Sequence, residues 1–119
     1  MSLSGLGEDN RKYSTNKPRT LYHVSPPDNY NSILERGVDP AFSQSHPERV
    51  YFCERRALFW AIQHIARKHK VEPENLIIFK VRSGKSTRHW GNGLWFDTRP
   101  KRAHYFDDAV WHIRKQKVN

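Results

Sequence analysis

Two side chains on short β-prone segments could do chemistry. His23 lies in the run 21–24, where it alternates with apolar neighbours, and Tyr51 lies in the run 50–53. A neutral imidazole can donate and accept a hydrogen bond at the same time, and a phenol ring offers a face for stacking. Taken singly, each residue is more often ordinary strand material than a ligand contact. Both runs lead directly into a predicted helix, so the two positions share a local context.

Positive charge is the second chemical feature. The chain has 21 lysines and arginines against 12 aspartates and glutamates, a net charge of +9, and the whole excess falls after residue 50. Such a balance favours an acidic partner. Within the glycine-containing stretch 82–102, cations could bind nucleic-acid phosphates and an aromatic ring could stack on a base. The candidates are Arg82, Lys85, Arg88, Trp90 and Arg102; the ordinary alternative is a solvated charged surface.

The elements that must position these residues can be predicted from periodicity and from turn residues. Residues 1–19 are expected to form a flexible leader and residues 20–119 a single domain. Helices are predicted at 28–36, closed by Gly37, and at 55–69. Strands are predicted at 21–24, 50–53, 76–81, 93–97, 104–106 and 109–113. The loop around Gly84, Gly91 and Gly93 is expected to be exposed, with Trp95 and Trp111 in the core. The fold class is therefore α+β, with the helices early and the sheet late.

Several classes of protein and site are disfavoured. One domain of 119 residues leaves no room for separate cofactor and substrate domains, and no apolar run approaches the roughly 20 residues of a membrane span. The first residues lack a secretory signal and Cys53 is the only cysteine, so a cytoplasmic location is expected. His64 and His69 do not share a helix face, and no metal site is predicted.

The order of these segments resembles a known family. The series Leu21-Tyr-His-Val-Ser25, then Gly37-Val-Asp-Pro40, then Val50-Tyr-Phe-Cys53 and the helix that contains Ala57 looks like the N-terminal half of the ADP-ribosyltransferase-like fold. The nearest branch is the histidine-first one, which includes diphtheria-toxin-like, poly(ADP-ribose)-polymerase-like, DNA-modifying and RNA 2′-phosphotransferase proteins. The likeness covers about residues 20–82.

That resemblance implies a split mixed β-sheet with two early helices and a cleft that holds NAD in a bent form. His23 would bond the ribose or the amide on the nicotinamide side, and Tyr51 would stack on the nicotinamide ring. Tyr22 and Ser25 would border the cofactor, and Arg19 could hold its pyrophosphate. Both rings are then expected to line one hollow. The implied function is NAD-dependent transfer of ADP-ribose to a macromolecule, with a nucleic acid or another acidic polymer as partner.

The family's site commonly includes a carboxylate, and here the sequence departs from the pattern. No glutamate follows Glu74, and the strand predicted at 93–97 offers only Asp97. Asp97 is either a catalytic acid that faces the cleft or a turn residue at the end of a strand.

Two other functions fit the same residues. A metal-independent ribonuclease could pair His23 with His46, His89 or His104 as acid and base, beside Arg82 or Lys85. A non-catalytic nucleic-acid-binding module on a degenerate transferase fold would explain the missing glutamate and the positive charge.

Overall fold

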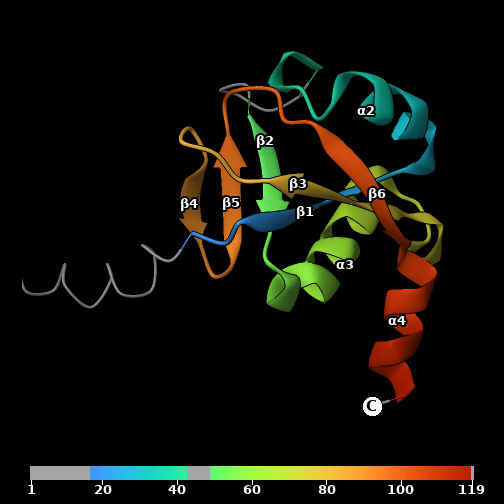
Figure 1. Cartoon of the computed structure of the whole chain (residues 1–119). Coiled ribbons are helices and arrows are strands. Elements are labelled where there is room, and N and C mark those ends of the chain that lie inside the picture. Colours follow the sequence, from blue (N-terminus) through green and yellow to red (C-terminus); the bar gives the residue numbers. More distant parts are fainter. Residues whose placement is uncertain (1–16, 43–48, 119) are drawn as a thin grey trace, which may run out of the picture.

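The computed structural model describes residues 17–42 and 49–118 of the chain (Figure 1). Most of the predicted leader, and His46, lie outside the described residues. Within the described part, no helix is long and apolar enough to cross a membrane.

A six-stranded sheet forms the centre of the described chain. Its strands are β1 (Thr20–Ser25), β2 (Val50–Cys53), β3 (Ile77–Arg82), β4 (Arg88–Gly91), β5 (Leu94–Asp97) and β6 (Ala103–Asp108). They lie in the order β4-β5-β2-β1-β3-β6, and every pair is antiparallel. The prediction of a mixed sheet was wrong, because β1 lies between β2 and β3 and separates the two strands that run in the same direction.

The sheet consists of two halves with little pairing between them. β1 pairs with β3 at six positions and β2 pairs with β5 at four, whereas one residue pair, Tyr22 with Cys53, gives the register of β1 on β2. In Figure 1 the strands β2, β5 and β4 run across the direction of β1 and β3. The described chain therefore has a sheet that separates between β1 and β2.

Three α-helices pack against the sheet in the described part: α2 (Tyr30–Arg36), α3 (Leu58–His69) and α4 (Ala109–Val118). Short 3₁₀ turns at Pro27–Asn29 and Arg55–Ala57 lead into the first two. The predicted strands and helices up to residue 82 are confirmed to within one or two residues at most boundaries. The buried face of α3 follows the predicted apolar spacing, with Leu58, Ala61, Ile62 and Ala66 buried.

Two hydrophobic cores lie on the two sides of the sheet. One packs α3 and α4 against Tyr22, Val24 and Cys53. The other, on the opposite side, joins Ile33 of α2 to Phe79 and Trp95 of the sheet. Successive residues of β1 and β2 alternate between these cores, which fixes the side of the sheet on which each candidate residue lies.

The glycine-rich loop contains a hairpin that the sequence interpretation missed. β4 and β5 are joined by Asn92 and Gly93, whose φ angles of 52° and 81° both lie in the left-handed region. Two such residues form the two-residue turn that matches the twist of a hairpin, and Asn-Gly is its strongest sequence signal. β4 is an outermost strand of four residues, and its register shifts between His89 and Gly91.

The segment predicted as a last strand, 109–113, is instead the start of α4. Ala109 and Ile113 are four residues apart and are both buried in the α3 core, which is helical spacing. The amide of Ala109 donates to the carbonyl of Leu76 at 3.0 Å, at the point where the helix begins. Trp95 is in the core as predicted, but Trp111 is 55% exposed, so its predicted burial was wrong.

Candidate functional site

His23 lies at the point where the two half-sheets separate. It is the residue after Tyr22, which pairs with Cys53, and its Nδ1–H donates to the carbonyl oxygen of Tyr51 at 3.0 Å. Its ring lies edge-on to Phe52, with 5.9 Å between the ring centres. The side chain thus links β1 to β2 just beyond their register pair.

The surroundings keep this imidazole neutral. Burial lowers the pKa of His23 below its ordinary value of 6.5, and the hydrogen bond to the Tyr51 carbonyl opposes this effect only in part. Because Nδ1 carries the proton of that bond, Nε2 of the neutral ring is an acceptor. His23 can therefore receive a hydrogen bond from a hydroxyl or an amide.

The lowered pKa predicts how stability depends on pH. Below pH 6.5 the unfolded chain binds a proton at residue 23 that the folded chain does not, so the free energy of unfolding should fall as the pH drops through this range. In His23→Asn, whose amide can still donate to Tyr51, this part of the pH dependence should disappear. Urea unfolding above and below pH 6.5 measures it, with exposed His104→Asn as the control. An unchanged pH profile in His23→Asn would contradict the assignment.

Tyr51 is close to His23, but its ring lies on the other side of β2. Its ring centre is 4.9 Å from that of Trp90 and 6.4 Å from that of Phe96, whereas the neighbouring Phe52 belongs to the core on the His23 side. The two candidate side chains border the strand separation from opposite sides. The expectation that both rings line one hollow is corrected accordingly, because alternation along β2 turns Tyr51 away from Phe52.

Two of the other predicted cofactor contacts are structural. Tyr22 is buried in the α3 core and packs on Phe106 at 5.0 Å between ring centres. Ser25 is 1% exposed; its hydroxyl donates to Pro26 and accepts from Asn29, at the start of the turn before α2. Both side chains therefore occupy buried positions in the first strand. Arg19 is exposed, as a pyrophosphate contact requires.

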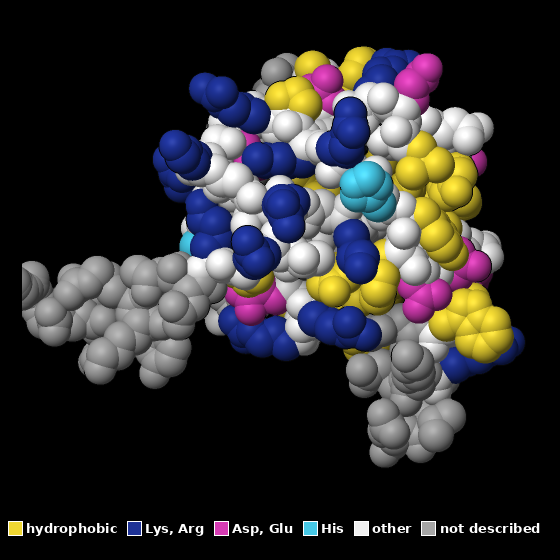
Figure 2. Space-filling view, viewed as in Figure 1, with side chains coloured by type: hydrophobic (Ala, Val, Ile, Leu, Met, Phe, Trp, Pro, Cys, Tyr) yellow, Lys and Arg dark blue, Asp and Glu magenta, His cyan; other side chains and the backbone are white. Residues whose placement is uncertain are grey.

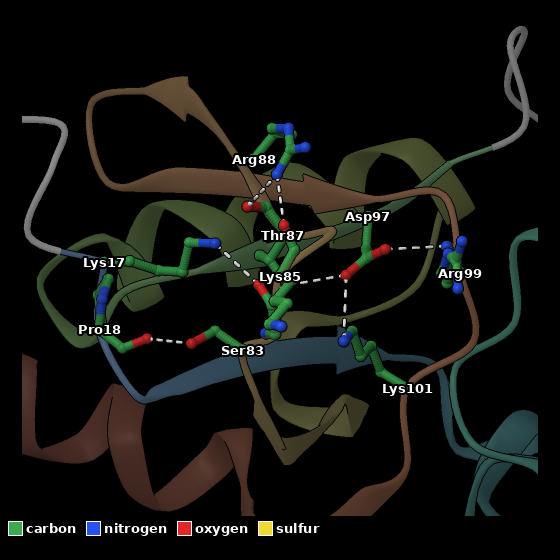
Figure 3. A network of polar contacts seen from close by, with 10 residues as sticks. Lys17, Pro18, Ser83, Lys85, Thr87, Arg88, Asp97, Arg99 and Lys101 are labelled. Carbon is green, nitrogen blue, oxygen red and sulfur yellow. Dashed lines mark hydrogen bonds and ion pairs between the residues drawn. The ribbon is translucent and has the colours of Figure 1, made fainter.

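Asp97 has the geometry of a structural residue at the end of a strand and not that of an acid that faces a cleft. It is fully buried, and Figure 3 connects three groups to its carboxylate: Thr87 Oγ1 donates at 2.7 Å, the Arg99 amide at 2.9 Å, and Lys101 Nζ lies 3.4 Å away. Burial opposes ionisation, but these partners and Ser86 outweigh it and lower the pKa of Asp97. The carboxylate joins the β3–β4 loop to the β5–β6 loop.

A basic hollow lies over this buried carboxylate. Its volume is about 460 Å³ and its lining is Lys85, Ser86, Arg88 and Arg99. Figure 2 shows Lys and Arg side chains gathered over the left and centre of the view, where Figure 1 places β4 and β5 at the left and β2, β1 and β3 at the centre. Of the predicted phosphate contacts, Lys85 and Arg88 are brought together here. Arg82 and Arg102 are exposed but do not line the hollow.

Residues 17–19 continue the domain towards the N-terminus. Lys17 Nζ donates to the Gly84 carbonyl at 2.8 Å, and Ser83 Oγ donates to the Pro18 carbonyl (Figure 3). The backbone amide of Ser83 also donates to the backbone carbonyl of Arg19. These contacts attach the start of the described chain to the β3–β4 loop.

Sequence reasoning missed Ser86, Arg99 and Glu54. Glu54 follows β2 directly, and its carboxylate accepts from Trp95 Nε1 at 2.8 Å and from Arg56 Nε at 2.9 Å. Burial opposes its ionisation, but these two donors lower the pKa of Glu54 below 4.5. Only its place at the end of a strand that contains Tyr51 could have drawn attention to it.

Burial raises the pKa of the neighbouring Cys53 thiol to about 12, so that thiol is not a nucleophile.

The geometry does not favour the histidine-pair ribonuclease. His89 on β4 is separated from His23 on β1 by the strands β5 and β2, a distance of about 14 Å at ordinary strand spacing. His104 pairs with Lys80 on β3, whereas His23 pairs with Phe79, so the two histidines point to opposite sides. An acid and a base on one phosphodiester must be much closer together.

No family model, no curated protein and no solved structure matches this chain.

Proposed function

We propose that this chain binds NAD where β1 and β2 separate and transfers its ADP-ribosyl group to a macromolecular acceptor. The observation that carries the proposal is the neutral His23 imidazole, held at that separation by the carbonyl of Tyr51 at 3.0 Å. The resemblance of residues 20–82 implies a dinucleotide at this place and a sheet divided in two. A six-stranded sheet whose halves share one register pair supports the proposal.

The reaction breaks the bond between the ribose carbon and the nicotinamide nitrogen, and the electron pair leaves with nicotinamide. His23 Nε2 accepts a hydrogen bond from a ribose hydroxyl and so orients the sugar. A nicotinamide ring beside the imidazole would lie on the His23 side of the sheet, and the Tyr51 phenol, on the opposite side, would not contact it. The acceptor atom then bonds to the ribose carbon and loses its proton to water.

The carboxylate of the proposed site is Glu54 rather than Asp97. Asp97 is fully buried, so its oxygens are not accessible to a sugar. Glu54 is ionised, its side chain is 21% exposed, and it lies three residues after Tyr51. A nearby negative charge stabilises the positive charge that develops on the ribose. Glu54→Gln should therefore lower transfer with little change in NAD affinity.

The test uses labelled NAD and measures binding and nicotinamide release separately. His23→Asn keeps a donor for the Tyr51 carbonyl but removes the Nε2 acceptor, so the fold should survive while NAD affinity falls about tenfold, the effect of about 1.4 kcal/mol for one hydrogen bond. His104→Asn, on the exposed side of β6, is the matched control and should behave as the wild type.

Two results would overturn the proposal. One is the absence of any NAD-induced change in the NMR signals of residues 22–24 and 50–52 at millimolar NAD. The other is equal NAD affinity and equal nicotinamide release in the wild type and in His23→Asn.

A further inference from the structure

We infer that single-stranded nucleic acid binds on the β4 side of the molecule, with its phosphates in the basic hollow and an unpaired base on the ring of Trp90. This inference does not depend on NAD. The residues that carry it are Lys85, Ser86, Arg88 and Arg99, which line the hollow, and Trp90 with its neighbour Tyr51.

The hollow is built for an anion. Three of its four lining residues are cations and none is acidic. Asp97, the acid beneath it, already faces Lys101 and two other donors, so it leaves the charge of the lining cations largely uncompensated. Arg88 Nη1 donates to the Lys85 carbonyl at 2.5 Å, which holds the guanidinium in place while its other N–H groups stay available. Fixed cations bind phosphate oxygens through charge-assisted hydrogen bonds.

Trp90 provides an aromatic face next to these cations. The residue is 58% exposed, although indole is large and mainly apolar, and its ring is supported by Tyr51 at 4.9 Å between ring centres. Supported aromatic rings that remain open to solvent are the platforms on which nucleic-acid bases stack. The ring therefore has an available face and little conformational freedom to lose.

The two features lie on the same side of the sheet. Arg88 pairs with Phe96, and the rings of Phe96 and Trp90 both lie against Tyr51, so Arg88 and Trp90 belong to one surface. A further cation continues the surface, because the Arg49 guanidinium lies 4.3 Å from the centre of the Phe96 ring and Phe96 pairs with Arg88. A strand of nucleic acid along this line would meet phosphate contacts and a stacking ring in turn.

A single strand fits this surface better than a duplex does. Bases in a duplex stack on each other and expose only their edges, so Trp90 would have no base face to cover. The cations alone would bind either form through the phosphates. Preference for a single strand is therefore the property that separates a stacking surface from a merely positive one.

The experiment measures the affinity of the full chain for fluorescent oligothymidylate, oligouridylate and a blunt duplex of equal length, by anisotropy at several salt concentrations. We expect the single strands to bind at least about fivefold more tightly than the duplex, and Trp90→Ala to remove that difference. Trp111→Ala, another exposed tryptophan, on α4, is the matched control and should change nothing. The DNA and RNA probes show whether the sugar matters.

Charge variants test the hollow separately. Lys85→Gln and Arg99→Gln should each weaken binding and reduce the slope of log affinity against log salt by about 0.7, whereas Arg67→Gln on the exposed side of α3 should leave the slope unchanged. Circular dichroism confirms that each variant is folded. The inference is overturned if single strand and duplex bind equally, if Trp90→Ala binds as the wild type does, or if neither nucleic acid binds. Loss of NAD binding alone leaves it intact.

Discussion

Replacement of Asp97 by asparagine is expected to lower the free energy of unfolding by about 3 kcal/mol. The carboxylate is fully buried and receives Thr87, the Arg99 amide and Lys101. Asparagine is neutral and presents an NH₂ group to these donors, so the Lys101 charge, whose side chain is only 17% exposed, loses its counter-charge. The melting temperature should fall by about 12 °C or more for a domain of this size.

Thermal unfolding of Asp97→Asn beside Asp39→Asn checks this result. Asp39 also accepts a backbone amide, that of Ala41 at 2.9 Å, but at an exposed position, and its substitution should cost less than about 1 kcal/mol. The pH dependence adds a second measurement. Because the pKa of Asp97 is lowered by folding, its contribution is present above pH 3.8 and is lost as the pH falls further, so that acid-induced loss should be smaller in Asp97→Asn. Equal melting temperatures for the two variants would contradict the structural role.

Gly37→Ala should be about as damaging, for a different reason. Gly37 has a φ of 80°, and a Cβ atom there would lie 2.4 Å from the carbonyl oxygen of Lys101. The backbones touch because Val38 and Lys101 exchange hydrogen bonds of 2.7 and 2.9 Å. Strain and overlap together are expected to cost about 3 kcal/mol, since neither backbone can move without loss of this bridge.

Gly91→Ala separates the two contributions. Gly91 also has a positive φ, 132°, but nothing lies within 4 Å of its missing Cβ. Urea unfolding of both variants should show the larger loss at Gly37, and the difference measures the overlap with Lys101. A smaller loss at Gly37 than at Gly91 would refute this account. Asp97→Asn and Gly37→Ala act on the same loop, so the loss in the double variant should be less than the sum.

Local pattern predicted the first two thirds of the fold well. The apolar spacing of α3 and the β-branched run of β3 are consistent over whole elements, so neighbours along the chain determine them. α4 was misread because Val110, Trp111 and Ile113 have strand preferences, while the pairing of Ala109 and Ile113 with α3 decides in favour of a helix. A loop is predicted in place of β4, because Gly84, Gly91 and Gly93 are typical of loops, although Asn92-Gly93 is also the signal of a two-residue hairpin turn.

The candidate site was predictable in parts. The strand positions of His23 and Tyr51 were predicted from local pattern, but their sides of the sheet follow from the register of β1 on β2, which no local pattern contains. The basic hollow could not be foreseen, because Lys85 and Arg99 are brought together by a carboxylate between two loops. In the amino-acid sequence, a buried structural Asp cannot be distinguished from a turn Asp or from a catalytic acid.

The outermost position of β4 bears on self-association. An unprotected sheet edge recruits strands from other molecules and starts aggregation. Here the edge has four residues, includes a glycine with a positive φ and changes register at that glycine, so it offers few consecutive amides and carbonyls to an incoming chain. The strand that presents Trp90 to solvent is therefore a poor template for cross-β growth. The exposed Trp90 ring can remain accessible to solvent while the β4 edge resists strand-by-strand aggregation.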